Sequence, residues 1–145
     1  MVIERAEEAT EELVESIRYL LPFLSPSAPA PTASEVAEIT SSPATTVFVA
    51  RDGKNGPIVG TLTLAMFRIP SGLRAWIEDV IVAETSRGQG CGEALTKAAL
   101  DCARSAGART VDLTSRPARE AANRLYQRMG FSLRDSNVYR YEVLA

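Results

Sequence analysis

The stretch VIVAETSRGQGCGEAL, residues 80–95, decides the fold because two kinds of secondary structure meet in it. It opens with an apolar β-branched run typical of a strand, and after Gly90 the apolar residues recur with the spacing of a helix. Between the two stand Arg87 and three glycines at alternate positions, Gly88, Gly90 and Gly92. Glycine has no Cβ and adopts backbone conformations that other residues avoid. The stretch therefore predicts a strand, a tight turn and the first turn of a helix.

The hydrophobic spacing on either side predicts the remaining elements. The expected helices cover residues 7–20 (ended by Pro22), 34–40 (with Thr32 and Glu35 as a capping box), 90–106 and 117–129, and the expected strands cover 1–6, 45–52, 58–69, 74–83, 110–114, 131–135 and 138–143. This order predicts an α+β fold. It would form one domain over residues 1–145, with a mixed, mostly antiparallel central sheet of six to seven strands and helices on both faces.

Composition excludes several classes of protein. The chain has 145 residues, of which 46% are hydrophobic and 23% are charged, as in globular proteins. It has no histidine, which removes the commonest general base and metal ligand, and we expect no metal site. No apolar run reaches the roughly 18 residues that a membrane span needs. The acidic start is unlike a basic signal peptide, so we expect a cytoplasmic protein.

Charge is distributed unevenly along the chain. Residues 1–50 hold eight acidic and two basic residues, whereas residues 51–145 hold fourteen basic and ten acidic residues. A small polyanionic ligand is therefore expected to bind the second part. The basic residues are dispersed and the sequence pI is about 5.3, which argues against a nucleic-acid partner.

The glycine turn has the chemistry of an anion-binding loop. The first N–H groups of a helix have no partner within the helix and lie at the positive end of its dipole. A phosphate at that end accepts their hydrogen bonds, and glycines allow it to come close. A Walker P-loop is excluded because Glu93 and Ala94 follow the last glycine instead of Lys-Ser/Thr. Taken alone, the glycines also fit a plain tight turn.

Two motifs carry a resemblance to a known family. The segment from Arg87 to Gly92, RGQGCG, fits the Gln/Arg-x-x-Gly-x-Gly/Ala signature of the GNAT superfamily of acyl-CoA-dependent N-acetyltransferases. The segment AANRLYQRMGF, residues 121–131, is similar to the second signature of that family, with a tyrosine four residues before Gly-Phe. One strand is expected between the motifs, as in the family. The resemblance covers residues 45–143 well.

The resemblance implies acetyl-CoA as the cofactor. The main chain of Val80 and Val82 would pair with the pantetheine arm like an added strand, and the next strand would splay away to make room for the thioester. The backbone amides of the loop would hold the pyrophosphate; the loop residues carried over by position are Arg87, Gly88, Gln89, Gly90, Cys91 and Gly92.

Tyr126 is the candidate general acid. It occupies the position of the GNAT tyrosine, and a phenol can donate a proton to a departing thiolate. The alternative is a half-buried aromatic residue at the edge of an amphipathic helix.

Glu78 is the candidate general base. It lies in WIEDVIV, residues 76–82, where a carboxylate inside a central strand is costly without a reason and burial would raise its pKa. The segment IEDV also resembles the matching strand of glucosamine-6-phosphate N-acetyltransferases. Alternation along the strand places Asp79 on the other face. The alternative role for Glu78 is an acceptor contact or a rim carboxylate paired with Arg74.

Two residues of the second motif region are expected near the cofactor. Arg119 stands where many GNAT enzymes carry a pantetheine-binding asparagine, and either it reaches a phosphate or it is a solvated surface residue. Asn123 lies on the same helix face and could replace the missing amide. Cys91 is expected to be a small core residue rather than a nucleophile, because no histidine is present to activate it.

These observations favour an N-acetyltransferase. It would move an acetyl group directly from acetyl-CoA to a primary amine of an unidentified small molecule or peptide. A non-catalytic acyl-CoA-binding or sensing module with the same fold is the alternative. A homodimer paired through the closing strand at residues 137–143 stays open.

Overall fold

The computed structural model describes residues 1–144, which divide into two compact units, Met1–Thr114 and a second unit that begins at Ser115. The first unit contains β1 (Val2–Ala6), α1 (Glu11–Leu24), α2 (Ala33–Ser41), β2 (Thr45–Arg51), β3 (Ile58–Ile69), β4 (Gly72–Val82), the 3₁₀ turn η1 (Glu84–Ser86), α3 (Cys91–Ala106) and β5 (Thr110–Asp112). The second contains α4 (Glu120–Arg128). The expectation of one domain over the whole chain stays a prediction.

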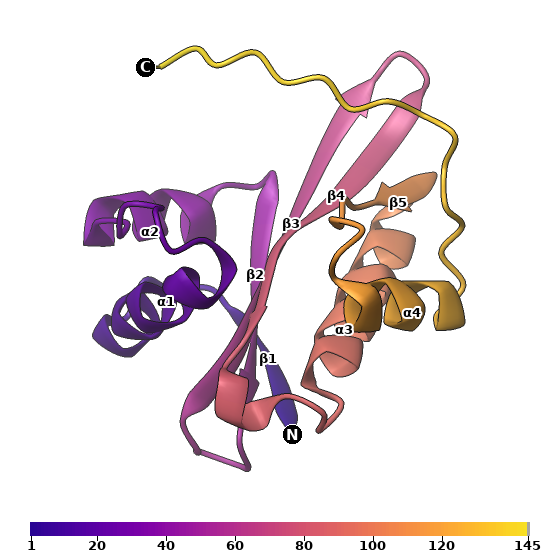
Figure 1. Ribbon diagram of the computed structural model, residues 1–145. Helices are drawn as coiled ribbons and strands as arrows, with labels where there is room; N and C mark the ends of the chain where they lie inside the picture. The colour runs from indigo at the N-terminus through magenta and orange to yellow at the C-terminus, as the bar shows by residue number, and fades with distance from the viewer. Residues whose placement is uncertain (145) are drawn as a thin grey trace. The chain divides into compact units, whose positions relative to one another are not determined.

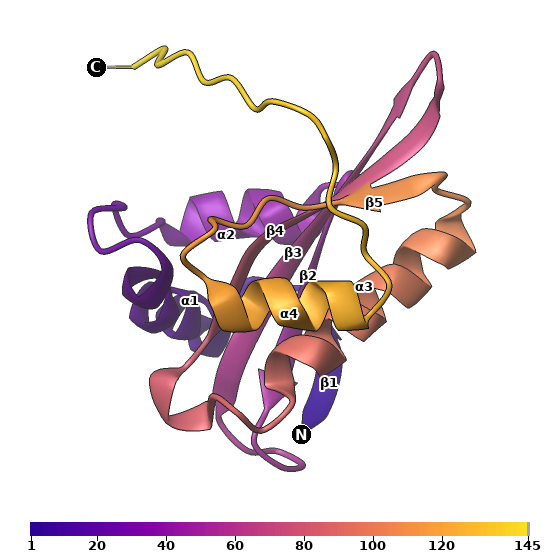
Figure 2. The ribbon, with the colours of Figure 1, turned by 45° about the vertical axis from the view of Figure 1, so that its right-hand side comes forward.

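A five-stranded sheet in the order β1-β2-β3-β4-β5 forms the centre of the first unit. Neighbouring strands are antiparallel except β4 and β5, which are parallel. The sheet lies between α1 and α2 on one face and α3 on the other (Figure 1). The β3–β4 hairpin is the longest part of the sheet and extends past its neighbours (Figure 2). The mixed sheet and the helices on both faces are as predicted.

Hydrophobic side chains on the two faces of the sheet anchor the helices. On the α1/α2 face, Leu13 and Val14 of α1 and Val36 of α2 pack with Val47 and Val49 of β2. On the other face α3 presents a buried stripe with many small members, Cys91, Leu95, Thr96, Ala99 and Ala103. Small residues let a helix lie close to a sheet, so α3 is held near β3.

Local capping interactions determine where α1 and α2 begin and end, and the end of α1 differs from the prediction. Thr10 accepts from the Leu13 N–H and begins α1, which continues past Pro22 to Leu24 instead of ending near residue 20. Proline in the last turn removes only one donor, and the Ser25 N–H still bonds to the Leu21 carbonyl at 3.0 Å. The predicted capping box at Thr32 and Glu35 is present at the start of α2.

The two closing strands predicted at 131–135 and 138–143 do not form, so the prediction of six to seven strands is wrong. Residues 131–144 adopt no regular secondary structure, and their large apolar side chains are exposed; Leu133 and Tyr139 are 90% and 88% accessible. Alternation indicates which residues could share a face of a strand. A strand also needs a neighbouring backbone, and none pairs with this segment in the described residues.

Within residues 1–144, no helix has both the length and the apolar character needed to cross a bilayer.

Candidate active site

The loop between β4 and α3 is shaped by two glycines in left-handed conformations. After η1, Gly88 has φ 78° and Gly90 has φ 80°, and Gly90 is the N-cap of α3. A Cβ built on either glycine would meet no other atom within 4 Å. These glycines are thus required by the backbone conformation and by open space in front of it, not by crowding within the protein.

Six consecutive backbone donors of this loop are unpaired. Among the residues that the structure describes, the N–H groups of 88–93 make no hydrogen bond, whereas the Ala94 N–H bonds to the Gly90 carbonyl. The Arg87 N–H already bonds to the Glu84 carbonyl at 3.3 Å, so the unpaired donors begin one residue later than predicted. The side-chain nitrogen of Gln89 donates a hydrogen bond to the Thr85 carbonyl oxygen at 3.5 Å, which stabilises the turn. These unpaired donors and the positive end of the α3 dipole have the geometry to bind an anion, and we call residues 88–93 the anion cradle.

Cys91 fixes the start of α3 against the sheet. It is buried, and its sulfur would lie 2.7 Å from a Cβ built on Gly60 of β3. Burial raises the pKa of its thiol, so the sulfur stays protonated at neutral pH. The side chain therefore has the character of the small core residue that was predicted, while its N–H belongs to the cradle.

One edge of β4 is unpaired where the cofactor arm was predicted to lie. The parallel strand β5 pairs only with Arg74, Ala75 and Trp76. Beyond Trp76, no strand within residues 1–144 covers that side of β4. The main chain at Val80 and Val82 can therefore accept an extended partner by strand addition.

A bulge in β4 places Glu78 and Val82 on opposite faces of the sheet. Glu78 pairs with Thr63, which pairs in turn with Val47 of the α1/α2 core. Val82 pairs with Gly60, and a Cβ built on Gly60 would point toward the Cys91 sulfur of α3. Directly opposed residues share a face, so Glu78 lies on the α1/α2 face and Val82 on the α3 face.

The bulge lies at Asp79 and Val80. These two residues together stand opposite the single residue Leu62, and Asp79 has φ 48°. The face of Asp79 stays a prediction, because regular alternation does not hold at a bulge. Sequence reasoning missed the bulge because neither Asp79 nor Val80 is a glycine.

Partial burial of the Glu78 carboxylate raises its pKa above the usual 4.5, and the like charge of Asp79 acts in the same direction. No ion pair joins Glu78 to Arg74 in the described part of the chain. The missing ion pair argues against the alternative in which Glu78 forms a structural salt bridge. The raised pKa instead favours a carboxyl group that can take up and release a proton.

In the second unit, Tyr126 projects from α4 and is 7% accessible. Its ring contacts Phe131 edge to face, with 5.7 Å between the ring centroids. Burial raises the pKa of its phenol, and the nearby Arg119 opposes that shift. The hydroxyl makes no hydrogen bond to any residue that the structure describes. At neutral pH Tyr126 is thus a protonated phenol with its proton available.

Asn123 and Arg119 form the first turn of α4. The Asn123 amide nitrogen donates to the carbonyls of Arg116 at 3.0 Å and Arg119 at 2.9 Å. Both of its donors are used within the turn, which leaves its carbonyl oxygen as the group that can meet a ligand. Arg119 is the N-cap residue of α4, and its side chain is exposed.

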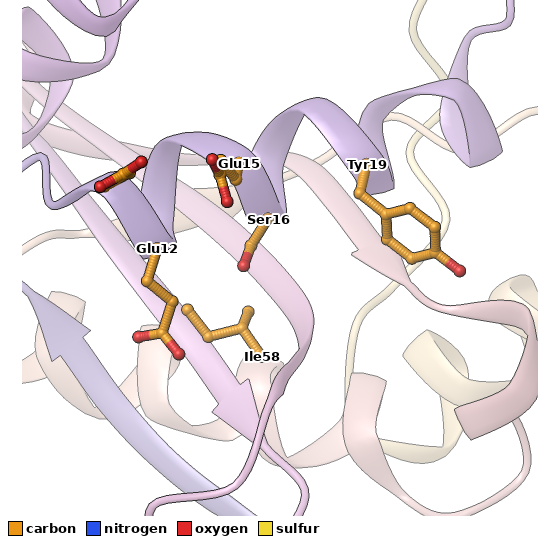
Figure 3. Close-up of a pocket in the computed structure, with 6 residues that line it drawn as sticks. Glu12, Glu15, Ser16, Tyr19 and Ile58 are labelled. Atoms are coloured by element: carbon orange, nitrogen blue, oxygen red, sulfur yellow. The ribbon is translucent and has the colours of Figure 1, made fainter.

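A hollow on α1 was not expected from the motifs. It has a volume of about 450 Å³ and is lined mainly by acidic and aromatic side chains of α1 (Figure 3): Glu11, Glu12, Glu15, Ser16, Tyr19 and Ile58. Arg51 donates to Glu12 at 2.7 Å and to Glu4 at 3.0 Å, and this pairing lowers the pKa of Glu12. The excess of acidic residues in the first 50 positions is the sequence signal that corresponds to this hollow.

Comparisons with known proteins show the family to which the chain is similar. The family model described as "Acetyltransferase (GNAT) family" matches residues 10–131. N-alpha-acetyltransferase 30 of Schizosaccharomyces pombe is 38% identical over 69 residues, a segment that covers 48% of this chain but only 45% of that protein.

Two solved structures match nearly the whole chain. A protein of Agrobacterium tumefaciens proposed to be an acetyltransferase is 25% identical, with a TM-score of 0.84 over 98% of this chain and 100% of that one. A transcriptional regulator from Bacillus halodurans is 26% identical, with a TM-score of 0.80 over 97% of this chain and 100% of that one.

Proposed function

The chain belongs to the acetyltransferase (GNAT) family, and on that premise we propose that it transfers an acetyl group directly from acetyl-CoA to a primary amine. The observation that carries the proposal is the run of six unpaired amides at residues 88–93, beside the uncovered edge of β4. The amides fit a diphosphate, and the strand edge fits the amide groups of a pantetheine arm.

Acetyl-CoA supplies the activated acetyl thioester. The N–H groups of Gly88, Gly90 and Gly92 bind its pyrophosphate, and the main chain of Val80 and Val82 aligns the arm. Arg119 and the Asn123 carbonyl oxygen are proposed as further contacts to the cofactor. In this proposal the chain fixes the donor with backbone groups, which is consistent with the three glycines among loop residues 87–92.

Two side chains are proposed to handle protons. The Glu78 carboxylate removes a proton from the acceptor ammonium, which makes the nitrogen lone pair available for attack on the thioester carbonyl. The Tyr126 hydroxyl donates its proton to the sulfur as the carbon–sulfur bond breaks. The raised pKa values of both groups support these roles, because Glu78 binds a proton more readily than usual and Tyr126 keeps its proton.

The acceptor is proposed to be a small-molecule amine or the amine of a peptide. A peptide α-amine deserves priority because the matched relative is named for α-amine acetylation, although the match spans less than half of that protein. Calorimetry with acetyl-CoA, followed by a thiol-release screen against small amines and peptides, tests the proposal. Binding without release of thiol for any amine would favour a sensing module, and absence of binding would overturn both.

A further inference from the structure

Part of the sheet face that carries Glu78 is left uncovered. On the α3 face, the side chains of the β3–β4 pair are buried at Leu64, Ala75 and Ile77. The side chains that alternate with them lie on the α1/α2 face and are half-buried or exposed. The helices α1 and α2 therefore do not seal this stretch, and the β3–β4 hairpin extends past its neighbours (Figure 2). We call the stretch the open face, and its residues are Thr63, Ala65, Phe67, Arg74, Trp76 and Glu78.

Charge is ordered along the open face. At one end, Glu78 is joined by Asp112 of β5, which pairs with Trp76 and so lies on the same face. At the other end stands Arg74, four residues before Glu78 on β4. Four residues of a strand span about 13 Å. The open face is thus negative at the end where an acceptor amine would react and positive at the far end.

Arg74 has no acidic partner in the protein. Its half-buried side chain forms no ion pair and no side-chain hydrogen bond within residues 1–144. Residues 64–77 include no acidic residue. A second guanidinium, that of Arg109, is held at the same end of the hairpin, where its Nη1 donates to the Ser71 carbonyl oxygen at 2.6 Å. The free donors of Arg74 therefore fit an anionic group that comes from outside the chain.

Two aromatic rings belong to the open face between its charged ends. Trp76 lies midway between Glu78 and Arg74 along β4. Phe67 is directly opposite Arg74 on β3, and it is 42% accessible. Aromatic side chains supply a large apolar contact area. A ligand that spans the two charged ends would therefore pass over an apolar surface.

We propose that the open face selects acceptors that carry a primary amine at one end and an anionic group about 13 Å away, which in a peptide means a free α-amine and an acidic fourth residue. The inference rests on the proposed acetyl transfer, because Glu78 receives the amine. Three steps of an extended peptide cover about 10 Å, and the side chains of the peptide and of Arg74 span the remainder. The carboxylate pairs with Arg74, and the segment between lies on Trp76.

A binding measurement that needs no turnover tests the proposal. Trp76 is the single tryptophan of the chain, so its fluorescence reports directly on the open face. The probes are three alanine-based hexapeptides with free α-amines that differ only in the fourth residue, which is glutamate, glutamine or lysine. The titrations contain CoA in place of acetyl-CoA, so that no acetyl group is transferred. We expect the glutamate peptide to bind about tenfold more tightly than the glutamine peptide, the usual gain from a charge-assisted hydrogen bond, and the lysine peptide to bind least.

Charge reversal assigns the selectivity to one side chain. In Arg74→Glu the lysine peptide should bind more tightly than the glutamate peptide, which reverses the order found in the wild type. Arg68→Glu is the matched control, because Arg68 is exposed on the same hairpin but pairs with Leu73 on the α3 face. This control makes the same change in net charge, and it should keep the wild-type order of the three peptides.

Three results would overturn the proposal: no saturable fluorescence change with any peptide, equal affinity of the wild type for the glutamate and glutamine peptides, or the same effect in Arg68→Glu as in Arg74→Glu. Failure of the proposed function looks different. The peptides would then bind in the expected order, but acetyl-CoA would release no thiol with any of them. Conversely, thiol release at equal kcat/KM for the glutamate and glutamine peptides would support acetyl transfer and exclude the selectivity.

Discussion

Gly60 and Cys91 are in direct contact: a Cβ built on Gly60 would lie 2.7 Å from the Cys91 sulfur and 3.2 Å from the Ile81 carbonyl oxygen. The contact joins β3 to the first residue of α3, and it therefore sets the height of the anion cradle above the sheet. Position 60 is thus reserved for glycine by packing, whereas Gly88 and Gly90 are glycines because of their φ angles.

Gly60→Ala should destabilise the fold by about 1–3 kcal/mol, the usual cost of adding a methyl group to a filled core. Cys91→Ala removes the sulfur that the new methyl group would meet, so the double variant should be more stable than the sum of the single changes predicts, by about 1 kcal/mol. Urea unfolding of the four proteins measures this coupling. Strictly additive effects would show that the two residues do not constrain each other.

Gly90→Ala should weaken acetyl-CoA binding about tenfold or more, equivalent to about 1.4 kcal/mol. The new Cβ projects into the open space in front of the unpaired amides. Gly53→Ala is the matched control, because Gly53 has a similar φ of 83°, also has open space around it, and lies in the β2–β3 turn. Both variants should lose about 1–2 kcal/mol of stability. Calorimetry must show an affinity loss only for Gly90→Ala, and an equal loss in both would refute the assignment.

Glu78→Gln should change both the rate and the stability with pH. Because the pKa of Glu78 is raised above 4.5, the wild-type rate should fall on the acid side with a midpoint above that value. Glutamine should remove this acid limb and lower the plateau of the rate roughly 100-fold or more.

The same substitution should change the pH dependence of folding stability. A carboxyl group such as Glu78, whose pKa is raised in the folded state, stabilises the protein below its unfolded pKa, and that stabilisation is lost as the pH rises through the folded pKa. Relative to the wild type, the variant should thus gain stability between pH 4 and neutrality, as measured by denaturant titration at each pH.

Tyr126→Phe should lower kcat about 100-fold through loss of the proton donor. The unfolding free energy should change by less than about 0.5 kcal/mol, because the hydroxyl has no protein partner among the described residues. Tyr139→Phe, an exposed tyrosine of the same unit, serves as the control and should match the wild type in both measurements. A single-turnover rate that is unchanged in Tyr126→Phe would exclude this residue as the acid.

Local signals in the sequence were sufficient for the elements on which the cradle depends. Gly90 and Gly107 cap the two ends of α3, and the small residues between them predicted that the helix packs closely on the sheet. The first strand, the capping box at Thr32 and the meander of three strands follow from equally local patterns. Each of these features is determined by residues within a few positions of one another, so the sequence could predict it.

Features that depend on distant pairing could not be predicted. The bulge at Asp79 is defined by the register against Thr61 and Thr63, which lie 18 and 16 positions earlier in the chain. The strands predicted at 131–135 and 138–143 had the right alternation, but alternation does not supply a partner backbone. For the site, Glu78 and Tyr126 stay predictions made from the sequence. The sequence could not tell that Arg87 already uses its amide or that Asn123 has committed both of its donors.

The uncovered edge of β4 beyond Trp76 has a consequence for handling the protein. This edge combines unpaired main-chain groups with the β-branched side chains of Ile77, Val80, Ile81 and Val82, and only Glu78, Asp79 and the bulge oppose the pairing of strands from separate molecules. A pantetheine arm lying along it would occupy the same hydrogen-bonding groups. The cofactor would then act as a shield against aggregation, and preparations saturated with CoA should stay monodisperse at concentrations at which ligand-free protein self-associates.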